Sequence, residues 1–459
     1  MKSKGIISLF LAVLIAALSA LALTGCGGEG SADNTDQTTS VEDVSSEEKE
    51  DTLNTLSEPS SNKTNNRPSS NKTNKPSSKR QQANNDEDGD DDMVYSKKDL
   101  ILLGLDPYIY SKSLKDAGNN ARIAALMKKA QKGGTYKIAV LGGSISRGAG
   151  AGGVSNSYGY LVCEWWKENF PKAKFEFVNA GIGSTNPEMA CYRLQADLLY
   201  AKPDFVVIDF AVNTYLDNDL YYTYSSLLYR ILSQSNSPAV MAIDFARNDE
   251  GKNTVPNSQL TRAAKENNIP SVSYNNYIWD RINRRYIKWI DISDDTIHPN
   301  SSGHLIASKI ITSHLENVKK NLAKTSTKIT APKKPDETQY LNLGYIINTQ
   351  KGVKLSGGFV ANDNKDTITH GWTYRATSGK SELYIPLPKN NGVKVLMFFT
   401  GTKQGSVKFT GQNGSTFTLG ASSAQTATLV DLDRVGTHIT ITPDMTEGSF
   451  TIYGVGVRY

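Results

Sequence analysis

Ile138-Ala139-Val140-Leu141-Gly142-Gly143-Ser144 is the stretch of sequence that decides the fold. Its apolar run is short and uncharged, which is typical of a strand buried on both faces of a parallel sheet. The two glycines let the backbone turn tightly and come close to a ligand. The stretch therefore predicts a buried strand that carries Ser144 at its carboxyl end, where a helix should begin.

The same alternation of strand and helix patterns continues along the chain. Further short apolar runs occur at 175–178, 205–210, 239–245 and 271–274. The segments between them, such as 158–169 and 187–200, space their apolar residues as helices do. Strands that alternate with helices form a parallel sheet covered on both faces, so residues 96–325 are predicted to be a three-layer α/β domain. Ligands of such sheets bind at the carboxyl ends of the strands.

A different pattern follows at the C-terminal end. Short runs of alternating apolar and polar residues, separated by Gly, Asn, Asp and Ser, fill residues 335–459. Regularly spaced short strands of this kind predict an antiparallel β-sandwich. Residues 326–334 are rich in Lys, Thr and Pro and are predicted to link the two domains.

The N-terminus has the composition of an export signal. Lys2 and Lys4 precede an uncharged apolar run over 6–23. The run ends in Leu23-Thr24-Gly25-Cys26, which resembles the lipobox of bacterial lipoproteins. The resemblance implies a signal peptide at 1–25 and a lipidated Cys26 that anchors the protein on the extracytoplasmic face of the cell membrane. The alternative is an uncleaved membrane helix with an incidental cysteine.

Residues 26–95 contain almost no apolar side chains and include the repeated sequence Pro-Ser-Ser-Asn-Lys-Thr-Asn at 59–65 and 68–74. A segment that cannot form a core is predicted to be a disordered polar tether. The net charge of +5 over 459 residues is too weak to imply nucleic acid binding.

The two remaining cysteines, Cys163 and Cys191, lie in predicted helices beside apolar residues. This placement favours buried free thiols over a disulfide, although the export signal leaves a disulfide open. No zinc-type spacing of Cys or His occurs, and the sequence predicts neither a metal site nor a cofactor.

Three polar stretches follow predicted strands or precede the last helix of the α/β domain: Asn179-Ala180-Gly181-Ile182-Gly183-Ser184, Ala211-Val212-Asn213-Thr214 and Asp295-Thr296-Ile297-His298-Pro299-Asn300. Together with the Ser144 stretch, and in this order, they resemble the four blocks of the SGNH/GDSL hydrolase family over residues 120–313. The resemblance implies that the three-layer parallel sheet is flavodoxin-like. The Ser144 stretch matches neither a phosphate-binding loop nor the Gly-x-Ser-x-Gly elbow of the α/β-hydrolases.

The resemblance implies a catalytic set of Ser144, His298 and Asp295. A serine hydroxyl needs a base to take its proton, and imidazole has a suitable pKa. His298 is the one histidine of five that has a carboxylate three residues earlier. Asp294 is an alternative to Asp295, and the family pattern selects Asp295.

The family also implies the groups that stabilise the oxyanion. They are the N–H of Ser144, a backbone N–H of the second block and the side chain of Asn213. Ser184 stands where the family has glycine, so the second donor is either Gly183 or Ser184. Thr214 stands where the family commonly has aspartate, and activity is expected to survive this change.

These features predict an extracytoplasmic serine esterase that removes O-acetyl groups from a polysaccharide or cell-wall glycan. The partners expected are an acetylated glycan, or another ester, and the membrane. A non-catalytic glycan-binding surface lipoprotein and a lipase or acyltransferase of the same fold are the alternatives. Trp279, Tyr286 and Trp289 are candidates for a sugar platform, although core packing would also explain them.

Overall fold

The computed structural model describes residues 95–458 apart from 215–218, 250–257, 363–369, 388–392, 401–404, 421–426 and 433–434. The predicted signal peptide, Cys26 and nearly all of the predicted tether therefore lie outside the described residues. Within the described part of the chain, no helix combines the length and the hydropathy needed to cross a bilayer.

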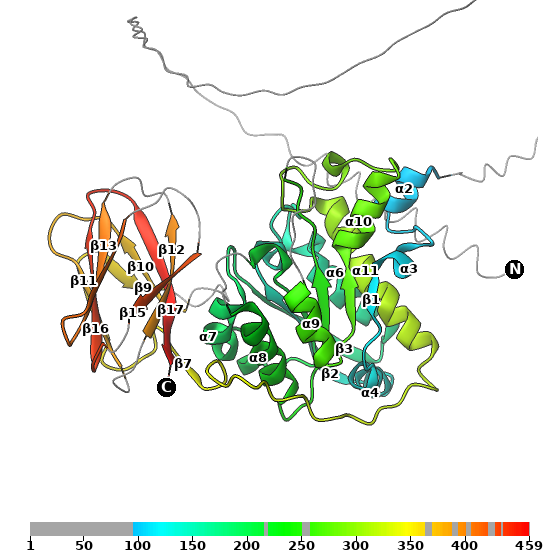
Figure 1. Cartoon of the computed structure of the whole chain (residues 1–459), viewed down its shortest axis with the longest axis horizontal. Coiled ribbons are helices and arrows are strands. Elements are labelled where there is room, and N and C mark those ends of the chain that lie inside the picture. Colours follow the sequence, from blue (N-terminus) through cyan, green and yellow to red (C-terminus); the bar gives the residue numbers. More distant parts are fainter. Residues whose placement is uncertain are drawn as a thin grey trace, which may run out of the picture. The chain divides into compact units, whose positions relative to one another are not determined.

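The α/β domain is built on one six-stranded sheet with the strand order β1-β6-β5-β4-β2-β3 (Figure 1). Its strands are β1 (Leu114–Asp116), β2 (Gly134–Gly142), β3 (Ala173–Gly181), β4 (Phe205–Asp209), β5 (Ala239–Asp244) and β6 (Ser271–Ser273). Strands β2 to β6 are parallel, and β1 pairs with β6 in the antiparallel direction at one edge. The order of the parallel strands is that of flavodoxin, which confirms the predicted fold class.

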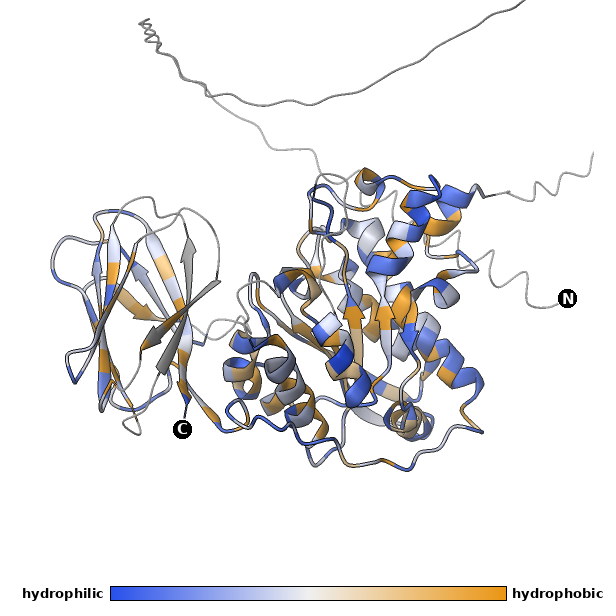
Figure 2. Cartoon of the chain, viewed as in Figure 1, coloured by the Kyte–Doolittle hydropathy of each residue, from blue (hydrophilic) through white to orange (hydrophobic). Residues whose placement is uncertain are grey.

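Two groups of helices cover the sheet. The first group packs on the face that buries Ile138 and Val140, and it consists of α4 (Ala121–Ala130), α6 (Tyr158–Asn169), α10 (Tyr274–Asn283) and α11 (Ser301–Lys320). The second group packs on the face that buries Ala139 and Leu141, and it consists of α7 (Pro187–Asp197), α8 (Leu220–Leu232) and α9 (Ser258–Glu266). The short helices α2 (Lys97–Leu102) and α3 (Ile109–Ser113) lie against α11. Figure 2 shows apolar residues along the strands between these layers.

The two cysteines of this domain are buried and are not joined by a disulfide. Cys163 packs in the core on one face of the sheet and Cys191 in the core on the other. A sheet separates the two thiols, which confirms the prediction of buried free cysteines.

The C-terminal region is an antiparallel sandwich of two sheets. One sheet has the order β15-β12-β17-β10-β9, with β7 paired to β17, and the other has the order β14-β13-β16-β11-β8. The strands are β7 (Leu343–Ile346), β8 (Lys354–Ser356), β9 (Phe359–Ala361), β10 (Trp372–Arg375), β11 (Glu382–Pro386), β12 (Val393–Thr400), β13 (Ser406–Gly411), β14 (Thr416–Gly420), β15 (Ala427–Leu432), β16 (His438–Asp444) and β17 (Ser449–Arg458). Trp372 is fully buried in the core of this sandwich, so its ring is not a surface for sugar.

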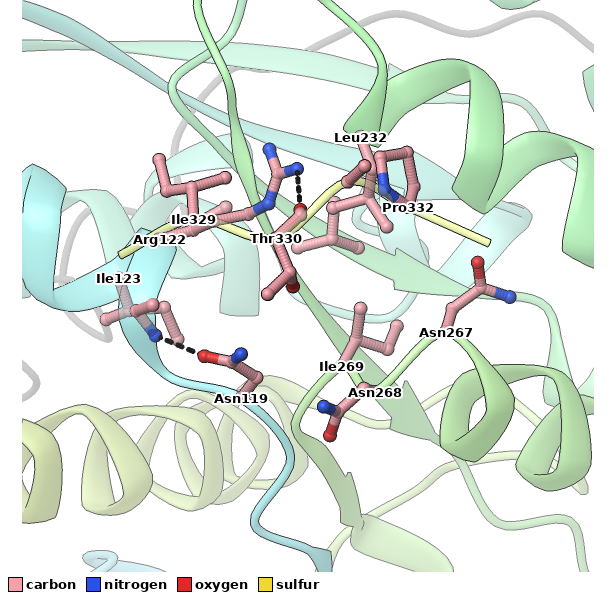
Figure 3. A pocket seen from close by; sticks show the side chains of 14 residues that line it. Asn119, Arg122, Ile123, Leu232, Asn267, Asn268, Ile269, Ile329, Thr330 and Pro332 are labelled. Carbon is pink, nitrogen blue, oxygen red and sulfur yellow. Dashed lines mark hydrogen bonds between the residues drawn. The ribbon is translucent and has the colours of Figure 1, made fainter. Parts of the chain in front are cut away.

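The predicted linker packs on the α/β domain. Arg122 donates to the carbonyl oxygens of Pro238, at 3.2 Å, and Thr330, at 3.3 Å. Figure 3 shows the bond to Thr330. Ile329 and Thr330 help to line a cavity of about 30 Å³, which has room for about one water molecule. The cavity lies where β5 begins, at the edge of the sheet opposite to the carboxyl ends of the strands.

Candidate active site

Ser144 begins the short helix α5 (Ser144–Arg147) directly after β2. Gly143 caps this helix, and a Cβ atom added to Gly143 would collide with the side-chain amide of Asn213. Only a glycine therefore lets the serine turn and the asparagine approach each other this closely. Gly148 ends the helix with φ of 105°.

His298 connects Ser144 to Asp295. Its Nε2 lies 2.9 Å from Ser144 Oγ, and its Nδ1 lies 2.6 Å from Asp295 Oδ2. The carboxylate fixes the tautomer that carries its proton on Nδ1, so Nε2 is free to accept the serine proton. Asp294 is exposed at the surface of this loop.

Asp295 is held as an anion by its own loop. Its Oδ1 accepts hydrogen bonds from the backbone N–H groups of Ile297, at 2.7 Å, and His298, at 2.6 Å. Partial burial raises the pKa of Asp295, but the hydrogen bonds from His298 and Ile297 outweigh it and bring the pKa below the usual value. The carboxylate therefore stays charged at neutral pH, as the partner of an imidazolium must.

Several side chains hold the loop that carries Asp295 and His298. Ser293 Oγ lies 2.9 Å from the Asp295 carbonyl oxygen and 2.7 Å from that of His298. Trp289 Nε1 donates to the Asp295 carbonyl oxygen at 2.6 Å. Asn300 ends the loop by capping α11, since its side chain accepts from the N–H of Gly303. Pre-organisation of this kind keeps a catalytic base in one geometry.

The second and third blocks reach the serine from neighbouring strands. A Cβ atom added to Gly183 would lie 3.8 Å from Ser144 Cβ, so this residue borders the nucleophile. Ser184 follows it with φ of 59°. Asn213 is buried in the 3₁₀ helix η3 (Ala211–Asn213), which directly follows β4. These groups meet at the carboxyl end of β2, which lies between β4 and β3 in the sheet.

The backbone of Ser184 explains why the family pattern has glycine at this place. Its φ of 59° lies in the left-handed region, which glycine adopts without cost and other residues adopt at a cost of about 1 kcal/mol. The positive φ therefore favours glycine at this place, and Ser184 adopts it at that cost. The N–H that the turn presents does not depend on the side chain.

Arg193 ties the nucleophile turn to the oxyanion turn. It lies in α7 and is fully buried. Its Nη2 donates to the Gly142 carbonyl oxygen, at 3.0 Å, and to Thr185 Oγ1, at 3.1 Å. Its Nη1 donates to the Ala180 carbonyl oxygen, at 2.7 Å, and pairs with the buried Asp197, at 2.9 Å. One guanidinium thus fixes the ends of β2 and β3 and the loop after Ser184.

Asp209 is hydrogen-bonded to the backbone of the turn that carries Asn213. Its Oδ1 accepts from the N–H of Ala211 at 3.2 Å, while Oδ2 is buried without a hydrogen-bond partner among the described residues. Burial raises the pKa of Asp209 to about 7, and repulsion from Asp244 adds to this effect. The carboxyl therefore holds a proton over much of the acidic range.

The other two histidines of the α/β domain are structural. His304 accepts from the N–H of Tyr158 and lies 3.0 Å from the Ala149 carbonyl oxygen, and burial lowers its pKa to about 4. His314 lies 2.8 Å from Asn120 Oδ1, and burial likewise lowers its pKa to about 4. Both rings are neutral at working pH and neither is hydrogen-bonded to Ser144.

Residues 140–306 match the family described as GDSL-like lipase/acylhydrolase. The chain contains a GDSL-type esterase domain. Two similar solved structures are of a two-domain esterase active on acetylated mannans, one of them crystallised with mannopentaose. They are 26% and 27% identical to this chain, each has a TM-score of 0.65, and each covers 76% of this chain. The alignment spans 97% and 98% of those chains.

An acetylxylan esterase from Geobacillus stearothermophilus is also similar, at 18% identity over 39% of this chain and 94% of its own, with a TM-score of 0.33. The comparison with curated proteins gives no match.

The sequence did not point to several residues of this esterase site. Arg193, Asp209 and Ser293 lie outside the family blocks or at their borders, and each acts through a contact that only the folded chain shows. Arg193 had one signal, because an arginine between Tyr192 and Leu194 in an apolar helix, four residues before Asp197, is unusual unless it is paired. The three predicted aromatic residues separate: Trp279 and Trp289 stack with ring centroids 5.9 Å apart, whereas Tyr286 borders a pocket beside α2.

Proposed function

We propose that the esterase removes O-acetyl groups from a polysaccharide through an acyl-enzyme formed on Ser144. The observation that carries the proposal is the continuous line from Ser144 Oγ through the His298 ring to Asp295, with separations of 2.9 Å and 2.6 Å. A serine, an imidazole and a carboxylate in this order constitute an acyl-transfer site.

In the proposed reaction, His298 Nε2 takes the proton of Ser144 while Oγ bonds to the acetyl carbonyl carbon. The oxyanion that forms is stabilised by the N–H of Ser144, by the Gly183–Ser184 turn and by Asn213. Collapse breaks the bond to the sugar oxygen, which receives the proton from His298. Water then attacks the acetyl-serine with His298 again as the base, and acetate leaves as Ser144 regains its proton.

The two-domain relatives support the proposed class of polysaccharide. The esterase active on acetylated mannans aligns over nearly its whole length with this chain, including the region that forms the sandwich here. An acetylated mannan, or another acetylated glycan with a similar backbone, is therefore the proposed substrate. Membrane anchoring through Cys26 would place the site outside the cytoplasm, next to such polymers.

The catalytic roles are tested by substitution. Ser144→Ala and His298→Ala should each lower kcat on 4-nitrophenyl acetate by several orders of magnitude, because they remove the nucleophile and the base. Asn213→Ala should cost about 10²- to 10³-fold, the usual effect of losing one oxyanion donor. Asp295→Asn should leave measurable turnover with a misoriented ring.

Acetate release from acetylated mannan by the wild-type protein is the matching test of the substrate class. Full activity in Ser144→Ala would refute the mechanism. Binding of mannan without any acetate release would instead support the non-catalytic glycan-binding alternative.

A further inference from the structure

A cavity of about 380 Å³ lies beside the loop that carries Asp295 and His298. Trp279 of α10 and Trp289 form part of its wall, and their rings are inclined by 26° to each other. Both side chains are only partly buried. The cavity is separate from the pocket beside α2 and from the small cavity under the linker.

The wall of this cavity is bonded directly to the catalytic loop. Trp289 Nε1 donates to the Asp295 carbonyl oxygen at 2.6 Å, and the N–H of Asn248, another lining residue, donates to the Thr296 carbonyl oxygen at 2.9 Å. Asn248 follows β5, so the cavity opens at the edge of the sheet where Ser144 also lies. A ligand in it would lie beside the loop that carries Asp295 and His298.

Arg285 adds a polar group to the rim. Its side chain is exposed, and its guanidinium forms no ion pair with another described residue. Its backbone has φ of 60°, a conformation that costs an arginine about 1 kcal/mol and that Gly or Asn would adopt more easily. This conformation belongs to the Schellman motif that ends α10, in which the N–H of Arg285 donates to the Ile282 carbonyl oxygen at 2.8 Å and the N–H of Tyr286 donates to the Arg281 carbonyl oxygen at 3.0 Å.

From this arrangement we infer that the cavity is a subsite for a sugar residue that neighbours the acetylated one in the polymer. Aromatic rings with a polar rim fit a pyranose, whose apolar face packs on an aromatic surface while its hydroxyl groups reach polar side chains. The inference rests on the proposed function and extends it, because it makes the esterase dependent on a chain of sugars rather than on a single acetylated sugar.

The experiment compares two substrates of the full-length protein. Trp279→Ala should lower kcat/KM on an acetylated mannopentaose by about tenfold or more relative to its effect on 4-nitrophenyl acetate, mainly through KM. Arg285→Gly should lower kcat/KM on acetylated mannopentaose less than Trp279→Ala does. The variant should fold well, since glycine adopts the backbone conformation at this position without cost. Tyr108→Ala is the matched control, because Tyr108 is an aromatic residue that is 60% exposed beside α2. It should leave the ratio of the two activities unchanged.

A binding measurement separates the two proposals. Ser144→Ala should bind unacetylated mannopentaose in calorimetry, and adding Trp279→Ala should weaken this binding by about tenfold or more. Circular dichroism confirms that each variant is folded, and Trp279→Phe replaces Trp279→Ala if the latter is not. The subsite alone would be overturned if the wild type releases acetate from mannan but the ratio of kcat/KM on acetylated mannopentaose to kcat/KM on 4-nitrophenyl acetate is the same in Trp279→Ala and the wild type. The proposed substrate class would be overturned if the protein hydrolyses small esters but neither releases acetate from acetylated glycans nor binds mannopentaose.

Discussion

Ser184 shows how a single backbone angle constrains the chemistry. The residue sits at φ of 59° beside the nucleophile, and the N–H groups of this turn are the candidate oxyanion donors. The turn presents these groups only while it keeps the left-handed conformation.

Ser184→Gly should therefore keep both the fold and the turnover. Glycine relieves the cost of the positive φ, while its greater freedom in the unfolded chain offsets part of this gain, so the free energy of unfolding should change by less than about 1 kcal/mol. Denaturant midpoints and kcat on a small ester measure the two effects. A loss of more than about tenfold in kcat would show that the serine side chain takes part in catalysis.

Ser184→Pro cannot decide whether Gly183 or Ser184 donates. Proline fixes φ near −65°, so it would break the turn as well as remove the N–H. Ser184→Ala keeps the N–H at the same conformational cost and should stay within about tenfold of the wild-type kcat.

Asp209 gives the stability of the esterase domain a predictable dependence on pH. Its pKa of about 7 in the folded protein lies above the value of about 3.9 for an unfolded aspartate. Between these values the folded state holds a proton that the unfolded state has lost, so rising pH removes stability across this window.

Asp209→Asn should remove this contribution. An amide keeps an acceptor for the Ala211 N–H but does not ionise, so the variant should lose less stability than the wild type, by about 2 kcal/mol, between pH 5 and pH 8. Urea unfolding at several pH values gives the comparison. Buried aspartates that do not interact with Asp209 cancel, because both proteins contain them. Asp244 repels Asp209, so its own contribution also changes in the variant and belongs to the measured difference. Parallel curves for the two proteins would mean that Asp209 is ionised in the folded state.

Among the elements, α7 has a role beyond covering the sheet. It carries Arg193, whose guanidinium joins the ends of β2 and β3, and Asp197, which neutralises it. Because these strand ends carry the nucleophile and the oxyanion turn, α7 fixes their spacing.

Arg193→Lys should weaken both the fold and the rate. A lysine cannot hold the four acceptors that the guanidinium spans, and buried groups left without partners cost about 1–3 kcal/mol each. We expect a loss of about 2–4 kcal/mol in stability and a lower kcat, with KM for a small ester less affected. Asp197→Asn is the matched variant, since it removes the partner but leaves the guanidinium bonds to the strand ends. A loss of stability in Arg193→Lys with kcat unchanged would assign Arg193 a structural role alone.

The sequence predicted the elements with local signals and missed the contacts between them. Short apolar runs and helical spacing predicted the parallel sheet, and the alternation after residue 334 predicted the sandwich. The positions of Ser144, Asn213 and His298 followed from ordered motifs. Arg193 and Asp209 could not be found in this way, because their partners are carbonyl and N–H groups that come together only when the strands align. The sequence also could not show that Trp279 stacks with Trp289 and not with Tyr286, because this contact forms only in the folded chain.

At the scale of the whole molecule, the proposed anchor would set the place where the esterase meets its substrate. The proposed anchor is Cys26, and if the polar residues after it form the flexible coil that their composition predicts, they would give the esterase domain a reach on the order of tens of ångström from the bilayer. An acetylated polymer is too large to enter the cell, so a deacetylating enzyme gains from a position at the surface.

Cys26→Ser tests this placement. Without the thiol no diacylglycerol can be attached, so the variant should accumulate as an unprocessed precursor that takes up no labelled fatty acid, whereas the wild type should be shorter and labelled. Gly27→Ala, which changes a small residue next to the cysteine and leaves the thiol in place, is the control and should be processed and labelled like the wild type. The esterase activity per molecule should be the same in all three proteins, because the active site begins more than a hundred residues later, at Ser144. Normal processing and labelling of Cys26→Ser would refute the anchor and would leave the proposed chemistry at Ser144 standing.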